Sequence, residues 1–238
     1  MSYREIIIHS MNEYLAVISE ERLLDRKWIY RGQNRDYELP ILPSIARGNV
    51  DENSPRDEDA FFNMFERVLP LHSIRVFLRK LDILAIGQHF KLKTRLLDWT
   101  LSPLIGMYFA CDKLTEGRHS VIYACLFNDE FFLNGVEVDG FETDFNCTTK
   151  VKVYAPDFID IRVYNQRGAF TVHPFDTESN SYQGFDANTE GIQEMIKFIL
   201  PAEEIPSIKL QLEKLGLSPL TMYNTLEASA EYANNWKI

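Results

Sequence analysis

The stretch from Gln88 to Pro103 reads QHFKLKTRLLDWTLSP and places polar side chains among strongly apolar neighbours. Five of these side chains are able to bind a ligand or take part in chemistry: Gln88, His89, Arg95, Asp98 and Thr100. A buried polar group without a partner costs roughly 1–3 kcal/mol, and a charged one costs more. We therefore expect the five to form one network or to line one pocket.

Helical patterns flank this stretch on both sides. Before it, apolar residues recur at helical spacing over about 72–90, and the phase of that face carries on to Gln88. After it, Ser102 and Pro103 begin a helix with an apolar stripe through Met107 and Cys111. A helix N-terminus carries free N–H groups and a partial positive charge, so the start of this second helix is a ready site for an anion.

The N-terminal part of the chain alternates helix, strand and loop signals. Ser10 and Glu13 have the spacing of a capping box, and residues 33–53 are rich in Pro, Gly, Asn and charge. The expected elements are a helix over 10–25, a strand at 28–30 that delivers Arg31, a surface loop over 33–53 and a second helix from Ser54.

From residue 119 the sequence becomes rich in β-forming residues, separated by Gly, Asn and Asp turns. The expected strands are 119–127, 136–138, 150–154, 158–166, 170–173 and 196–200, followed by two closing helices, the second from Ser218. Helices first and strands later favour an α+β fold over a doubly wound parallel sheet. We expect N-terminal helices packed on a mostly antiparallel sheet.

Composition limits the size and the partners of this protein. At 238 residues with 45% hydrophobic content, the chain can bury one sizeable core, so we expect a single domain over 1–238. A formal net charge of −10 argues against coating nucleic acid or an anionic membrane, since such binding draws on clustered Lys and Arg. Any phosphate that is recognised is expected on a small molecule, held by a few local arginines.

Cysteine usage and the N-terminus bear on the compartment. Three cysteines, without zinc-site spacing, are expected to be reduced thiols, two of them in the core, and no metal site is expected. Arg4 and Glu5 interrupt the N-terminus where a signal peptide needs an apolar run, and no run of 18 apolar residues occurs. We therefore expect a cytoplasmic protein, in a bacterial or phage-infected cell, that does not contact a membrane.

Three sequence elements together resemble the FRG domain. They are Arg31-Gly32, the segment Gln88-His89 with Thr94-Arg95-Leu96-Leu97-Asp98-Trp99-Thr100, and Gln166 in a downstream motif. The resemblance spans about residues 25–235 and is strongest from Thr94 to Pro103. This family is widespread in bacteria and their viruses, which implies a role in bacterium–phage conflict.

The same elements are also similar, more weakly, to the ADP-ribosyltransferase superfamily, which implies that build and NAD as a substrate. In that superfamily a first-strand arginine grips the NAD phosphate, and Arg31 fits this role. Hydroxyls of a second strand support the nicotinamide side, as Thr94 or Thr100 would. A glutamate on a later strand completes catalysis, whereas here the matching run 161–166 offers Gln166 and no glutamate.

For several candidate residues a structural role is an alternative to the functional one. Arg31, followed by Gly32 that permits a close approach, binds phosphate or pairs with Asp98. Arg95 binds phosphate or braces the loop. Asp98 is expected to orient His89 or Arg95 and to cap nearby N–H groups.

The reacting end is expected at His89, Thr94 and Gln166. His89 is the leading acid or base because a histidine pKa near 6.5 allows proton transfer at neutral pH. The Gln166 amide can hold a ribose hydroxyl or a carboxamide, and Phe170 can stack on a ring. With Arg31, Gly32, Gln88, Arg95, Asp98 and Thr100 as ligand contacts, these residues predict an NAD-type nucleotide site.

Two functions remain open. The first is a transferase or NAD-cleaving enzyme that acts at the nicotinamide bond, with a protein as a possible acceptor. The second is a binding module that senses a nucleotide or a partner protein without turnover, and the missing glutamate favours it.

Overall fold

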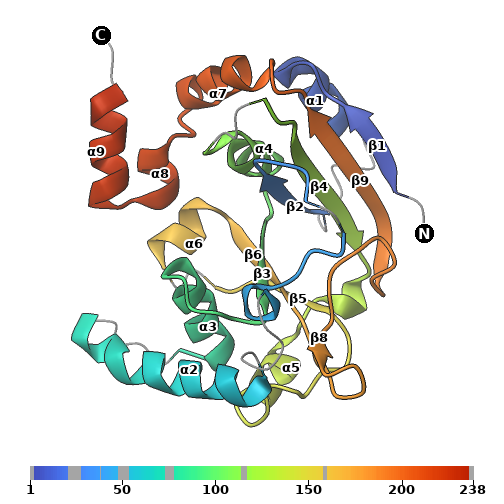
Figure 1. Cartoon of the computed structure of the whole chain (residues 1–238), viewed down its shortest axis with the longest axis vertical. Coiled ribbons are helices and arrows are strands. Elements are labelled where there is room, and N and C mark those ends of the chain that lie inside the picture. Colours follow the sequence, from blue (N-terminus) through green and yellow to red (C-terminus); the bar gives the residue numbers. More distant parts are fainter. Residues whose placement is uncertain are drawn as a thin grey trace.

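A seven-stranded sheet forms the centre of the protein, which we describe from a computed structural model (Figure 1). The structure describes residues 3–20, 28–37, 39–47, 54–72, 78–113, 117–157 and 160–235. From edge to edge the strands are β1 (Arg4–Ile7), β9 (Ile192–Leu200), β4 (Ser120–Phe127), β2 (Trp28–Gln33), β3 (Leu96–Thr100), β6 (Gly168–Val172) and β5 (Lys152–Tyr154). Only β1 and β9 pair in parallel among these strands, so the sheet is mostly antiparallel, as predicted.

The sheet opens between β2 and β3. Within the described residues these two strands pair at a single position, Tyr30 with Thr100. By contrast, β2 pairs with β4 from Trp28 to Gln33, and β3 pairs with β6 over its whole length. The facing edges of β2 and β3 therefore diverge after one pair.

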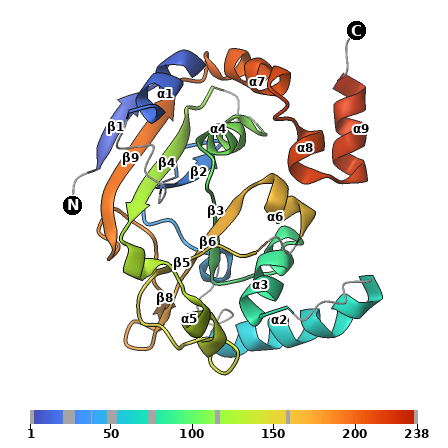
Figure 2. The ribbon, with the colours of Figure 1, turned by 180° about the vertical axis from the view of Figure 1, so that it is seen from behind.

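Helices cover the sheet in two groups (Figures 1 and 2). The helices are α1 (Met11–Ile18), α2 (Pro55–Val68), α3 (Lys80–His89), α4 (Pro103–Cys111), α5 (Gly135–Gly140), α6 (Ile161–Asn165), α7 (Ile205–Lys214), α8 (Pro219–Tyr223) and α9 (Leu226–Asn235). One hydrophobic core joins α1, α4 and α7 to β2, β4 and β9. A second joins α2 and α3 to β3, β5 and β6. A β-hairpin, β7 (Phe175–Asp176) with β8 (Ser181–Tyr182), lies outside the sheet.

The odd and even residues of the strands face different cores, as the pleat of a strand requires. Leu97 and Trp99 of β3 enter a third core together with Phe185, whose ring lies 4.8 Å from Trp99 in an edge-to-face contact. Leu96, on the other face of the same strand, packs in the core of α2 and α3. Asp98 and Thr100 share the face of Leu96, which places them between the two groups of helices.

Most of the predicted helix starts are confirmed, and one is wrong. Ser10 accepts a hydrogen bond from the Glu13 N–H and α4 begins at Pro103, both as predicted. However, α1 ends at Ile18, and the rest of the predicted helix over 10–25 lies largely outside the described residues. The predicted start of a helix at 72 is wrong, because α3 begins at Lys80, where the Asp82 carboxylate accepts from the Arg79 N–H.

Two predicted strands are short helices instead, and side-chain caps explain both corrections. At 136–138 the Asn134 side chain accepts from the Glu137 N–H and starts α5. Of the predicted strand 158–166, the first two positions lie outside the described residues, and in the rest the Asp160 carboxylate accepts from the N–H groups of Arg162 and Val163 and starts α6. A cap satisfies backbone donors that would otherwise seek a strand partner. Strand β1 and helix α9 had no counterpart in the sequence analysis.

The α+β class with a mostly antiparallel sheet is confirmed. The strands predicted near 28, 119, 150, 170 and 196 correspond to β2, β4, β5, β6 and β9. None of the helices in the described ranges is long and apolar enough to cross a membrane.

A buried ion pair anchors the start of β3 to α2. The Arg95 guanidinium lies 2.6 Å from the Glu58 carboxylate, and both side chains are fully buried. The Arg95 backbone N–H donates to the same carboxylate at 2.8 Å, and the Tyr182 hydroxyl donates to it at 3.1 Å. Arg95 also donates to the carbonyl of Phe145. The pair thus joins four segments that are distant in sequence.

We predict that Glu58→Gln lowers the free energy of unfolding by about 3–5 kcal/mol, because it leaves the buried Arg95 charge uncompensated. Urea denaturation measures the change. Glu66→Gln, an exposed substitution on the same helix, is the matched control and is expected to change stability by less than about 0.5 kcal/mol. Equal stability of the Glu58→Gln variant and the wild type would contradict the role of the pair.

His173 follows β6 and is fully buried in a hydrogen-bonded chain. Its Nε2 lies 2.8 Å from the Thr171 hydroxyl, its Nδ1 lies 2.7 Å from the Gln183 carbonyl, and Trp99 Nε1 donates to Thr171 at 3.0 Å. Burial lowers the pKa of His173 from 6.5 to about 4. The imidazole is therefore neutral in the folded protein at pH 7.

Acid is expected to destabilise the protein through His173. The unfolded chain takes up this proton below about pH 6.5, whereas the folded chain does so only near pH 4, so stability falls between these values as the pH falls. The full loss is about 3 kcal/mol. Urea denaturation at pH 7 and pH 4.5 should show a smaller decline for His173→Gln than for wild type. His9→Gln, at an exposed position, is the control, and an unchanged decline in His173→Gln would refute the assignment.

Candidate functional site

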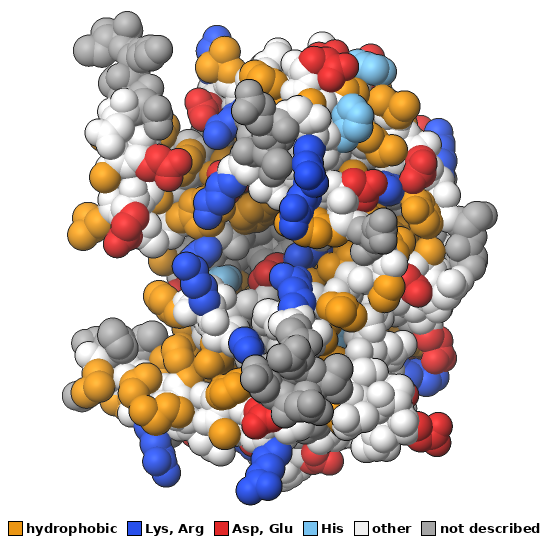
Figure 3. Space-filling model, viewed as in Figure 1, with side chains coloured by type: hydrophobic (Ala, Val, Ile, Leu, Met, Phe, Trp, Pro, Cys, Tyr) orange, Lys and Arg blue, Asp and Glu red, His pale blue; other side chains and the backbone are white. Residues whose placement is uncertain are grey.

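A cavity of about 610 Å³ lies at the opening between β2 and β3. Its walls come from β2, β3, the end of α3, the end of α4, α6 and α8. Figure 3 shows Lys and Arg side chains gathered round a hollow near the centre of this face. The charged residues that line the cavity are Arg31, Arg47, Lys113, Arg162, Asp98 and Asp112.

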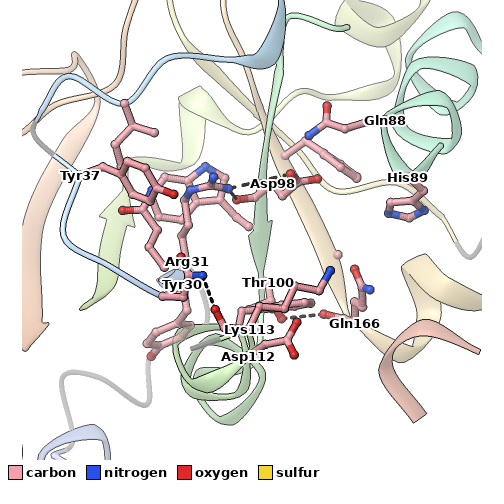
Figure 4. Close-up of a pocket in the computed structure, with 18 of the residues that line it drawn as sticks. Tyr30, Arg31, Tyr37, Gln88, His89, Asp98, Thr100, Asp112, Lys113 and Gln166 are labelled. Atoms are coloured by element: carbon pink, nitrogen blue, oxygen red, sulfur yellow. Dashed lines mark hydrogen bonds and ion pairs between the residues drawn. The ribbon is translucent and has the colours of Figure 1, made fainter. Parts of the chain in front are cut away.

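Arg31 bridges the opening of the sheet. Its Nη1 donates to the Asp98 carbonyl at 2.5 Å and lies 3.9 Å from the Asp98 carboxylate (Figure 4). The guanidinium thus takes the place of a backbone donor that β2 would supply if the two strands stayed paired. Burial lowers the pKa of Arg31 to about 10, so it remains charged at pH 7.

Gly32 has a packing role that the sequence analysis did not foresee. A Cβ at this position would lie 1.9 Å from the Gly106 carbonyl oxygen and 2.4 Å from the Ala110 nitrogen. Its lack of a side chain lets β2 press against the backbone of α4. Gly32 lines the cavity, but the close approach that it permits is to a helix.

Gln88 and His89 reach the cavity from the C-terminal end of α3, opposite Arg31 and Tyr37 in Figure 4. The Thr94 hydroxyl donates to the Gln88 side-chain oxygen, which fixes the amide. His89 Nδ1 lies 3.8 Å from the Asp160 carboxylate. Burial, followed by the charge of Arg162, lowers the pKa of His89, so its imidazole is neutral at pH 7.

Thr100 and Gln166 form the wall between α4 and α8. The Thr100 hydroxyl donates to the Gln166 carbonyl at 2.7 Å, and the Gln166 amide donates to the Met222 carbonyl at 3.0 Å. Gln166 follows α6 as its C-cap and does not lie on a strand, which corrects the predicted location. Phe170 borders the cavity but is only 1% exposed, so it belongs mainly to the core.

Most of the predicted site residues converge on this cavity. Those that line it are Arg31, Gly32, Gln88, His89, Asp98, Thr100, Gln166 and Phe170. Thr94 and Arg95 do not line it: Thr94 is buried beneath Gln88, and Arg95 is held by Glu58. The prediction that Arg95 shares the cleft is therefore corrected. The sequence left two roles open for Arg95, phosphate binding and bracing of the loop, and the structure shows the second.

Three of the four cations that the described residues bring to the cavity were not predicted from the sequence. Arg47 comes from the predicted loop, Lys113 follows α4, and Arg162 lies on α6, which was expected to be a strand. Tyr37 and Tyr223 add aromatic surface to the lining. These residues come from separate elements, so no local pattern groups them.

Unsatisfied polar atoms also gather here. Buried side-chain atoms of the cavity lining that lack a hydrogen-bond partner among the described residues are Arg31 Nε, Gln33 Oε1, His89 Nδ1 and Arg162 Nε. Natural proteins rarely leave such groups unpaired, so several at one cavity indicate that a ligand completes them. In the ranges that the structure describes, no cluster of three or more His, Cys, Asp or Glu side chains is arranged to hold a metal.

Residues 26–118 match the family model of the FRG domain, which confirms the predicted resemblance. The matched range contains Arg31, Gly32 and the whole segment Gln88–Thr100, and it ends before Gln166 and Phe170. No curated protein and no solved structure matches the chain. The similarity to ADP-ribosyltransferases stays a prediction.

We predict that Gly32→Ala destabilises the protein by about 1–3 kcal/mol or more, because the new methyl group meets backbone atoms of α4 that cannot move aside. Thermal and urea unfolding measure this change. Gly135→Ala is the matched control, since a Cβ there meets no atom within 4 Å. A Gly32→Ala variant as stable as Gly135→Ala would show that α4 can shift away from β2.

Proposed function

From the FRG domain match and the geometry of the cavity, we propose that this protein binds a nucleotide of the NAD type, with phosphate on Arg31 and Arg47. The observation that carries the proposal is that the buried Nε of Arg31, which has no hydrogen-bond partner among the described residues, lies at one cavity with other unpaired polar atoms. A phosphate accepts charge-assisted hydrogen bonds from such groups. A cavity of about 610 Å³ is within the usual range for small-molecule sites.

The charge of the cavity supports an anionic ligand. Among the described residues, four cations and two carboxylates line it, a local excess of two positive charges, whereas the whole chain carries a formal net charge of −10. A positive concavity in an acidic protein attracts small anions. It does not provide the extended basic surface that long nucleic acids require.

The chemistry that this cavity would support is cleavage of the nicotinamide bond of NAD. In that reaction water attacks the ribose carbon, and nicotinamide leaves with the electrons of the broken bond. The Asp98 carboxylate, whose side chain is 53% exposed in the cavity, would stabilise the positive charge that develops on the ribose. Neutral His89 would accept the proton of the water. A protein acceptor in place of water would make the reaction a transfer.

The second candidate is a binding module without turnover. One observation favours it: no glutamate is among the described residues that line the cavity, and the Gln166 amide is engaged by the Met222 carbonyl. Such a module would sense a nucleotide, or a partner protein, in a conflict between bacterium and phage.

Binding is tested by calorimetric titration with NAD and with ADP-ribose. Arg31→Ala is expected to weaken both by about 10-fold to 150-fold, since a lost charge-assisted hydrogen bond is worth roughly 1.5–3 kcal/mol. Lys150→Ala, which removes an exposed cation outside the cavity lining, is the control. Wild-type protein that binds neither ligand would refute the proposal. An unfolded Arg31→Ala variant would identify Arg31 as a brace of the sheet, and Arg47→Ala would then decide.

Turnover is tested by nicotinamide release from NAD between pH 5 and 9. His89→Gln is expected to keep NAD affinity and lower the rate by about 10²-fold to 10⁴-fold, the usual contribution of a general base. Because the pKa of His89 is lowered, the wild-type rate should rise with pH below 6.5 and stay level above it. Unchanged turnover in the variant would remove His89 from the mechanism. Binding without release in wild type would favour the binding module.

A further inference from the structure

Two cations of the cavity have no part in the function proposed above. Arg162 lies on α6 and Lys113 directly follows α4, and both line the cavity together with His89 and Gln166. In Figure 4, Lys113 lies on the side of Thr100 and Gln166, away from Tyr37. Arg162 Nη1 donates to the His89 carbonyl at 3.3 Å, which ties it to this end.

Both cations are held over the ring of Tyr223 on α8. The Arg162 guanidinium lies 5.0 Å from the ring centroid and the Lys113 ammonium 5.5 Å from it. The Tyr223 hydroxyl donates to the Asp112 carboxylate, which fixes the ring. A cation over an aromatic face is weakly stabilised and keeps its remaining donors available.

Two carboxylates lie near these cations, and both accept hydrogen bonds from neutral donors. Asp112 accepts from Tyr223, and Asp160 accepts from backbone N–H groups at the start of α6. No ion pair of Arg162 or Lys113 occurs within the described residues, and the buried Nε of Arg162 has no hydrogen-bond partner there. Two positive charges near one ring repel each other, and an anion that contacts both would lower that cost.

The backbone conformation of Lys113 indicates that neighbouring groups hold this residue in place. Its φ is +48°, in the left-handed region that a residue with a side chain adopts at some cost. The Asn34 amide donates to the Lys113 carbonyl at 2.7 Å and holds this conformation. Strained residues that neighbouring groups hold in place cluster at ligand sites.

We propose that Arg162 and Lys113, over Tyr223, form a second anion subsite that takes a phosphate on the ribose of the nucleotide. The inference rests on the proposed function, and it names the ligand class: a nucleotide with two separate phosphate groups, one on Arg31 and one at this subsite. The nicotinamide ribose lies toward Asp98, as in the function proposed above. NADP, which carries a ribose phosphate apart from its pyrophosphate, represents this class, and adenosine 3′,5′-bisphosphate represents it without nicotinamide.

Calorimetric titration with matched ligand pairs tests the subsite. Wild-type protein should bind NADP at least about 10-fold more tightly than NAD, since one well-placed charged contact is worth at least that factor. Arg162→Gln should reduce the ratio of the two dissociation constants to within about twofold of one while leaving NAD affinity nearly unchanged. Arg31→Ala should weaken NAD and NADP by the same factor. Lys150→Ala should change neither.

A second pair locates the phosphate on the ribose. The gain in affinity from adenosine 3′,5′-bisphosphate over 5′-AMP is compared with the gain from NADP over NAD. If the gain in the first pair is larger, the subsite takes a 3′-phosphate. If the NADP to NAD ratio is larger, it takes a 2′-phosphate. Circular dichroism checks that Arg162→Gln is folded, and Lys113→Gln, with the same expected loss of preference, replaces it if it is not.

Three results would overturn the inference. Equal affinity for NAD and NADP, and for the bisphosphate and 5′-AMP, would refute the subsite while the proposed function stands. Equal weakening of NAD and NADP in Arg162→Gln would make Arg162 part of a single phosphate site. Absence of binding for all four nucleotides would remove the proposed function and the subsite together.

Discussion

The opening of the sheet between β2 and β3 is the constraint on which the rest of the site depends. One residue pair joins the two strands, while each is fully paired on its other side. The diverging edges leave room for a cavity inside the sheet, and Arg31 crosses it to reach the Asp98 carbonyl. The ion pair of Arg95 with Glu58 fixes the start of β3, and a shift of one residue there would turn Asp98 and Thr100 away from the cavity.

The charge of the cavity is opposite in sign to the net charge of the whole chain. The protein is acidic overall, yet among the described residues of the cavity the cations come from four different segments and outnumber the carboxylates. Arg31 has partial compensation from Asp98, whereas Arg162 and Lys113 rest on an aromatic ring. The two ends of the cavity therefore differ in how their cations are held, although Asp98 lines one end and Asp112 the other.

The sequence predicted what local signals determine and missed what distant contacts determine. The α+β class and the starts of α1 and α4 follow from periodicity and caps, and the convergence of Arg31, His89 and Asp98 follows from the need of polar groups for partners. Arg95 was assigned to the cavity by the same argument, since it is a polar residue among apolar ones. Its partner Glu58 lies 37 residues earlier, so only the folded chain shows that Arg95 is already paired. Lys113 and Arg162 have no pattern in common. The apolar alternation of 158–166 suggested a strand, and the Asp160 cap overrode it.

The contact of Gly32 with α4 has a consequence for how a ligand enters. Where β2 meets α4 at Gly32, backbone presses on backbone, so no side chain between the two elements can rotate to let one shift against the other. The opposite wall is attached differently: the side-chain amides of Asn165 and Gln166 donate to the carbonyls of Thr221 and Met222, at 2.8 Å and 3.0 Å. Those bonds can exchange with water while both helices stay intact. A displacement of α8 from α6 would therefore widen the cavity for a bulky ligand while β2 stays packed on α4.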